Sequence, residues 1–186
     1  MRKFIIAIAV LVAASGAWAI EVAGVKVDDK VSVGGQELVL NGAGVRTRAI
    51  FKVYVGSLYV PAKAADLNAV LAKGPRRIQM NVLRNLTPDQ LVDALVDGLK
   101  DNNSVDELNA VKTQQAELVT IMKSLGDVKE KDVVTLDFLD GATKIALNGT
   151  AKGSIAGEAF NRALTKVWLG DHPVQPDLKK AMLGGG

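Results

Sequence analysis

No cysteine occurs in the 186-residue sequence, and His172 is its single histidine. Zinc, haem and iron–sulfur sites therefore lack their usual ligands, and a Ser-His-Asp or Cys-His nucleophile system is nearly excluded. His172 precedes Pro173 in a turn segment, where contact with solvent or backbone is expected in preference to catalysis. No disulfide can staple the fold, so a hydrophobic core must hold it. We expect no metal and no cofactor.

Long hydrophobic runs are also missing, apart from residues 4–14. That run is about half the roughly 20 residues that a membrane-spanning helix needs, and no later segment is long and charge-free enough. Arg2 and Lys3 precede it, and Ala17-Trp18-Ala19 follows it as a small-x-small site. This pattern predicts a cleavable signal sequence over residues 1–19 and an exported protein, periplasmic or secreted; a retained N-terminal anchor helix is the alternative.

An excess of one charge is lacking as well. The chain has 23 basic and 20 acidic side chains, and removal of Arg2 and Lys3 with the signal leaves 21 against 20. Basic residues occur at most in pairs, such as Arg76-Arg77 and Lys179-Lys180, without the clustered footprint of a nucleic-acid binder. We therefore expect no nucleic-acid partner. The sequence leaves the oligomeric state open.

The remaining chain, residues 20–186, has the size of one domain. About 165 residues bury roughly 70% of the surface of the unfolded chain, which suffices without a disulfide. No internal repeat and no low-complexity linker divides it. We therefore predict a single domain over residues 20–186.

Strand patterns dominate residues 22–60. Valines and leucines alternate at period two, and Gly34-Gly35 indicates a hairpin. The run Asn41-Gly42-Ala43-Gly44 is expected to interrupt the pattern with residues that tolerate a positive φ. Residues 45–60 are then predicted to form one long strand, apolar on both sides and therefore covered on both faces.

Helix signals dominate the middle of the chain. A short helix is expected after Pro61, followed by a half-buried strand over residues 78–82. Thr87-Pro88-Asp89-Gln90 reads as a capping box that opens an apolar-striped helix. Ser104 to Glu107 is a second capping box, and its helix is predicted to continue to Gly126.

The last third predicts a hairpin and two helical segments. Residues 133–139 and 143–147 flank Asp140-Gly141, a strong two-residue turn signal. A helix over residues 158–168 and a final turn or two over residues 176–183 follow. Strands, then helices, then strands and a helix indicate the α+β class, with an antiparallel sheet and helices on one face.

Arg46, Arg48 and Tyr54 are the candidate binding residues. An arginine that follows a glycine turn at the head of an apolar strand can present five fixed donors to a carboxylate or phenolate. The ordinary alternative is that each arginine extends to the sheet edge and only keeps its charge in water. The carboxylates are scattered, and no acid and base pair follows from their spacing.

Several segments in order resemble the chalcone-isomerase-like superfamily, in particular its exported bacterial branch. They are Asn41-Gly42-Ala43-Gly44-Val45-Arg46, then residues 51–60, residues 132–138 with Asn148-Gly149, residues 153–160, residues 168–174 and residues 176–179. The resemblance implies an open-faced β-sandwich, in which a helical layer covers one face of a large antiparallel sheet and a ligand cleft lies between them.

The resemblance carries two functional expectations. Enzymes of the superfamily close a chalcone to a flavanone with an arginine that falls on Arg46. Two of their hydroxyl-bearing positions fall on Tyr54 and Val167. Noncatalytic, fatty-acid-binding members hold the carboxylate with an arginine and a tyrosine on the next strand, and Arg46 and Tyr54 match that pair.

An unbroken strand would separate Arg46 from Tyr54 by about 26 Å at roughly 3.3 Å per residue. The chain must therefore bend between Thr47 and Ile50 if the two residues share a ligand. Arg48 would lie on the same face as Arg46 in a regular strand, which makes it the rival for the same role.

Three functions remain open at this point. The preferred one is a noncatalytic, exported binder of a small apolar anion, such as a fatty acid or a phenolic compound. The second is an isomerase, an intramolecular lyase in which Arg46 is the catalytic candidate. The third is a protein-interaction module whose cleft is filled by its own side chains. An apolar cavity open to Arg46 would favour the first two.

Overall fold

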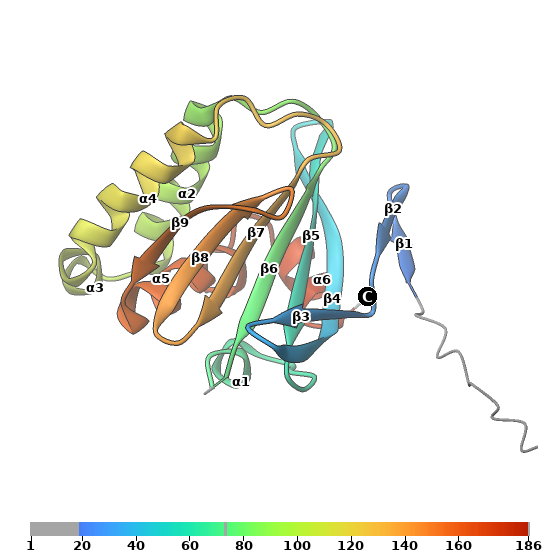
Figure 1. Cartoon of the computed structure of the whole chain (residues 1–186), viewed down its shortest axis with the longest axis horizontal. Helices are drawn as coiled ribbons and strands as arrows, with labels where there is room; N and C mark the ends of the chain where they lie inside the picture. The colour runs from blue at the N-terminus through green and yellow to red at the C-terminus, as the bar shows by residue number, and fades with distance from the viewer. Residues whose placement is uncertain (1–18, 73, 186) are drawn as a thin grey trace, which may run out of the picture.

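The computed structural model describes residues 19–72 and 74–185, so the predicted signal sequence lies almost wholly outside the described residues. Seven strands form one curled antiparallel sheet in the order β3-β4-β5-β6-β7-β8-β9, in which neighbours in sequence are neighbours in space. They are β3 (Lys30–Val33), β4 (Gln36–Arg48), β5 (Phe51–Val60), β6 (Arg76–Val82), β7 (Val133–Leu139), β8 (Ala142–Leu147) and β9 (Thr150–Ala156). The hairpin of β1 (Ile20–Val22) and β2 (Val25–Val27) lies beside β4 (Figure 1).

Helices cover one face of the sheet, as predicted. Helices α5 and α6 lie behind the strands, and α2 and α4 stand at the β9 side (Figure 1). The helices are α1 (Leu67–Val70), α2 (Pro88–Asn102), α3 (Val105–Ala110), α4 (Lys112–Ser124), α5 (Glu158–Leu169) and α6 (Pro176–Met182). Among the described residues, no helix has the length and apolar character needed to cross a membrane. The α+β class and the one-sided helical layer are thus confirmed.

Both predicted capping boxes are present. Thr87 and Gln90 bond each other's backbone at the start of α2, and Ser104 and Glu107 do the same for α3. The single helix predicted from Ser104 to Gly126 is wrong, because Val111 leaves helical geometry and divides it into α3 and α4. Val111 is only 1% exposed, so the break turns an apolar side chain into the core.

The core lies on both sides of the central strands. Leu58 and Val60 of β5 face the helices, whereas Val55 and Tyr59 pack against residues from β2 to β4. The Tyr59 hydroxyl donates a 3.0 Å hydrogen bond to the carbonyl of Asp28. The prediction that residues 45–60 are covered on both faces is therefore confirmed for residues 55–60, which are all buried, and is wrong for residues 48–52, which are exposed.

The Asn41 to Gly44 run does not interrupt the sheet, contrary to expectation, but lies inside β4. A β-carbon on Gly44 would come within 2.7 Å of the Ala181 β-carbon in α6. Asn41 is buried and donates to the carbonyls of Ala64 and Met182. Neither Gly42 nor Gly44 has a positive φ, so the backbone conformation does not require a glycine at either position. The missing side chains instead allow α6 to pack closely on β4.

The long strand predicted over residues 45–60 is also wrong. β4 ends at Arg48, β5 begins at Phe51, and Ala49-Ile50 forms the turn between them. Ala49 has a φ of 51°, which is unusual for a residue with a β-carbon. No glycine, asparagine or aspartate occurs at this turn, so its residue pattern indicated a continuous strand.

Strand β9 escaped prediction because it lies at the sheet edge. Its burial alternates poorly, and only Ile155 is fully buried in the segment. Gly153 faces Ile121 of α4, where a β-carbon would come within 2.5 Å of the isoleucine side chain. A polar edge strand that contacts a helix through a glycine carries little apolar periodicity.

Candidate ligand-binding site

A cavity of about 470 Å³ opens where the β4–β5 hairpin meets the first half of α2. Its inner wall is apolar and joins residues from the sheet, α2, α5 and the segment before α6. These residues include Met80, Leu86, Leu91, Leu95, Val167 and Val174. The volume lies within the range of pockets that hold small organic ligands. Helix α2 thus turns part of its apolar stripe toward the cavity instead of toward another element.

The turn at Ala49-Ile50 brings the two principal sequence candidates together. Arg46 and Tyr54 are direct cross-strand partners, and both line the cavity. Directly opposed residues in an antiparallel pair share a face with β-carbons about 5 Å apart. The chain therefore reverses between Thr47 and Ile50, where the sequence analysis expected a bend if Arg46 and Tyr54 were to share a ligand.

Arg46 is half-buried and is held by two acceptors. Its Nη1 donates to the Thr47 carbonyl at 2.8 Å and to the Gln175 Oε1 at 3.5 Å. Gln175 also ties down the backbone of β4, because its Oε1 accepts from the Thr47 amide and its Nε2 donates to the Val45 carbonyl. Gln175 is the N-cap residue of α6, but its side chain makes no capping hydrogen bond to that helix. The guanidinium is thus oriented by the edge of the strand and keeps further donors for a ligand.

Tyr54 is held by Trp168 of α5. The indole Nε1 donates to the Tyr54 hydroxyl oxygen at 2.9 Å, which leaves the phenol proton free to be donated elsewhere. Desolvation raises the pKa of Tyr54 to about 12, although the Trp168 hydrogen bond and the charge of Arg46 act in the opposite direction. The side chain is therefore a neutral hydrogen-bond donor at neutral pH.

Two further arginines stand at the rim. Arg48 and Arg84 are exposed, and both line the cavity. The Arg84 guanidinium lies over the Phe51 ring, 4.5 Å from its centroid. Within the described chain, no acidic side chain lines this cavity and neither arginine forms an ion pair. An apolar interior with a cationic mouth suits an apolar molecule that ends in an anion.

A second cavity, of about 590 Å³, lies at the opposite end of β6 and has a different character. It is lined by Arg76 and Arg162 but also by Asp140 and Glu158. Arg76 is 3% exposed and donates to the Thr165 Oγ1 and the Asn161 carbonyl, with its guanidinium over the Phe138 ring. The donors of Arg76 are thus occupied by contacts inside the protein. Because acidic as well as basic side chains line this cavity, it is the weaker candidate site for an anion.

The comparisons with known proteins agree with this fold. A family profile described as chalcone isomerase-like matches residues 19–184. The chain belongs to the chalcone isomerase-like family. A crystal structure of a fatty-acid binding protein from Arabidopsis thaliana superposes with a TM-score of 0.66 at 12% identity, covering 86% of this chain and 92% of that one. No curated protein sequence matches the chain.

Two further cavity positions of this chalcone isomerase-like protein bear on the enzyme alternative. Tyr54 and Val167, the two positions that carry a smaller hydroxyl side chain in the enzymes by resemblance, both line the cavity. Val167 is fully buried and apolar, so it adds no hydrogen-bonding group to the cavity wall.

Sequence reasoning identified Arg46, Arg48 and Tyr54, which all line the cavity of this chalcone isomerase-like protein, but missed Arg84, Gln175 and Trp168. Trp168 lies in a predicted helix and is buried, so nothing in the sequence distinguishes it from an ordinary core residue. Arg84 and Gln175 lie in connecting segments, and their approach to β4 and β5 depends on the fold. His172 is exposed and lies outside the cavity, and no group of three metal-ligating side chains occurs among the described residues.

Proposed function

We propose that this protein is a noncatalytic binder of an apolar carboxylate, such as a fatty acid, which enters the cavity with its tail inward. The observation that carries the proposal is the charge pattern of the cavity: arginines on one side, apolar walls beyond them and, among the described residues, no acidic side chain in the lining. Arg46 and Tyr54 would share the carboxylate, and Arg48 would attract it at the rim. The fatty-acid binding protein with the same fold supports this assignment.

The lining groups favour binding over proton-transfer chemistry. The cavity wall, as far as the chain is described, offers no histidine, lysine, aspartate or glutamate side chain, and the pKa of Tyr54 lies near 12. A general base works best when its pKa lies near the operating pH. Arg46 favours the alternative, cyclisation of a phenolic enone as in chalcone isomerases. We expect a 2′-hydroxychalcone to close no faster than in buffer, and saturable turnover abolished by Arg46→Ala would establish the enzyme instead.

Titration with a fluorescent fatty acid tests the binding proposal. Charge-assisted hydrogen bonds contribute about 1.5–3 kcal/mol, so Arg46→Ala should weaken binding by at least about tenfold. Arg46→Lys should restore only part, because an ammonium keeps the charge without the paired donors. Trp168 lines the cavity, so its fluorescence gives a second readout of the same event.

Arg162→Ala is the matched control, since Arg162 is exposed and lines the second cavity. It should bind the fatty acid like the wild type, and thermal melts should show that every variant is folded. If Arg48→Ala abolishes binding while Arg46→Ala keeps it, the roles of the two arginines are reversed. If the wild type binds no fatty acid, the proposal is wrong and the interaction module takes its place.

We also propose that the protein is exported and that the mature chain begins at Ile20. The support is the sequence pattern before Ala19. Intact-mass measurement of the exported fraction should find a species that lacks residues 1–19. Recovery of the full-length chain there would refute cleavage at this site.

A further inference from the structure

The tip of the β4–β5 hairpin exposes two adjacent large hydrophobic side chains. Ile50 is 86% exposed and Phe51 is 53% exposed. Among the described residues, only Ile20 and Val105 are other large hydrophobics of comparable exposure, and neither lies beside another. A single exposed apolar residue is ordinary on protein surfaces, whereas an adjacent pair at a hairpin tip is not explained by packing.

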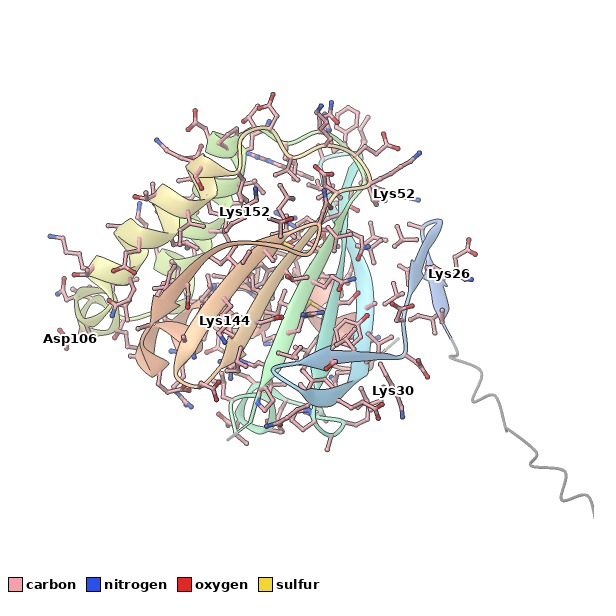
Figure 2. All side chains as sticks on the ribbon, viewed as in Figure 1. Lys26, Lys30, Lys52, Asp106, Lys144 and Lys152 are labelled. Atoms are coloured by element: carbon pink, nitrogen blue, oxygen red, sulfur yellow. The ribbon has the colours of Figure 1, made fainter. Side chains whose placement is uncertain are left out.

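Basic side chains flank this pair. Arg48 and Lys52 come from the same hairpin, and Arg84 stacks over Phe51. All three are exposed, and none forms an ion pair within the described chain. Figure 2 shows Lys52 at the end of the sheet where this hairpin lies. The neighbouring segment 127–132 adds three acidic and two basic residues, so the surroundings remain cationic in sum.

The same tip forms the rim of the candidate cavity. Arg48, Ala49, Phe51 and Arg84 are all lining residues, whereas Ile50 and Lys52 are not. Whatever docks against the tip therefore lies next to the cavity opening. The exposed pair and the cavity wall are continuous through Phe51.

We propose that this tip docks on an anionic lipid membrane, with Ile50 and Phe51 in the headgroup region and Arg48, Lys52 and Arg84 against the lipid phosphates. Two apolar side chains are too few for a stable protein interface, which buries at least about 1,000 Å². A membrane surface, by contrast, accepts isolated apolar side chains and attracts each nearby basic residue. The docking does not depend on the fatty-acid proposal, but it would place the cavity opening against a source of apolar ligands.

Co-sedimentation with vesicles tests the proposal. The purified protein is mixed at low salt with vesicles of phosphatidylcholine, either alone or with a third of phosphatidylglycerol. We expect binding to the anionic vesicles, weakened at least about tenfold by Ile50→Ser and roughly fivefold by Lys52→Gln. Raising the salt concentration should weaken it as well, since exposed charges are screened.

Two variants serve as matched controls. Val105→Ser removes an apolar side chain that is 73% exposed at the start of α3, far from the tip (Figure 1). Lys144→Gln removes an exposed lysine from β8, within the sheet (Figure 2). Both should bind anionic vesicles like the wild type. All four variants lie outside the cavity lining, so fatty-acid titration of the same samples reports the cavity separately.

Three outcomes would overturn the proposal. The first is a wild type that does not bind anionic vesicles even at low salt. The second is an equal loss of binding in Ile50→Ser and Val105→Ser. The third is self-association without lipid that Ile50→Ser abolishes in sedimentation velocity, which would assign the tip to a second copy of this chain.

Discussion

The β4–β5 and β7–β8 hairpins lie at opposite ends of the sheet, and both use two-residue turns. In the β7–β8 turn, Asp140 and Gly141 both have a positive φ, and these residue types tolerate it. In the β4–β5 turn, Ala49 takes a φ of 51° and Ile50 stands exposed. The turns at residues 34–35 and 148–149 resemble the β7–β8 turn, since both of their residues have a positive φ and the second is a glycine. Ala23 has a φ of 50°, close to that of Ala49, but a glycine follows it. Stability alone would favour a glycine at the Ala49-Ile50 turn as well.

Backbone strain tends to persist where function requires it. The β4–β5 turn carries the strain, the exposed isoleucine and the rim of the apolar cavity together, whereas the β7–β8 turn carries none of these. Arg46, near the β4–β5 turn, and Arg76, near the β7–β8 turn, differ in whether their donors are already occupied. Arg46 keeps donors for a ligand, while Arg76 is bonded inside the core. Under the proposed function, one end of the sheet serves stability and the other serves contact with a ligand.

The largest expected effect separates these two arginines. Arg76→Ala removes a buried side chain and leaves its acceptors without a donor, which should lower the free energy of unfolding by about 2–4 kcal/mol. Arg46→Ala loses the 2.8 Å hydrogen bond to the Thr47 carbonyl and the long one, 3.5 Å, to Gln175, and should cost about 1 kcal/mol. Urea denaturation measures both. Fatty-acid titration should show the reverse order, with affinity lost only in the Arg46 variant, and equal losses of stability would break the contrast.

The end of the sheet with the β7–β8 turn was predicted from the sequence better than the end with the candidate site. Asp140-Gly141 and both capping boxes were recognised because their residue types have a local preference for the observed geometry. The turn at Ala49-Ile50 was not, since neither residue favours a turn. Arg46 and Tyr54 were found as a pair through resemblance, but Trp168 and Gln175 reach them across 114 and 129 residues. Such contacts depend on tertiary structure, which no local pattern records.

A smaller effect concerns Tyr54, which serves both stability and the candidate site. Tyr54→Phe leaves the Trp168 indole N–H without its partner in a buried position, which should cost about 1–3 kcal/mol of stability at pH 8. The pKa of Tyr54 is raised to about 12 in the fold, so the unfolded chain loses this proton first as the pH rises. The stability advantage of the wild type over Tyr54→Phe should therefore be full below pH 10 and decline toward pH 12.

Denaturation of both proteins across this pH range measures the difference and cancels effects common to them. Tyr59, whose pKa is also raised to about 12 by desolvation, remains in both and contributes equally. An advantage that stays constant from pH 8 to pH 12 would show that the Tyr54 hydroxyl is not desolvated in the fold.

The smallest effects come from exchanging the turn chemistry of the two hairpins. Gly141→Ala should destabilise the protein by about 1 kcal/mol through backbone strain alone, because its φ is 69° and nothing lies within 4 Å of the added β-carbon. Ala49→Gly should do the opposite and stabilise by about 0.5–1 kcal/mol, since glycine relieves the strain but loses more freedom on folding. Neither substitution touches Ile50, so vesicle binding should persist in Gly141→Ala and change little in Ala49→Gly. If Ala49→Gly proves destabilising, the β4–β5 turn is not strained, and the difference between the two hairpins reduces to the exposed side chains at the tip.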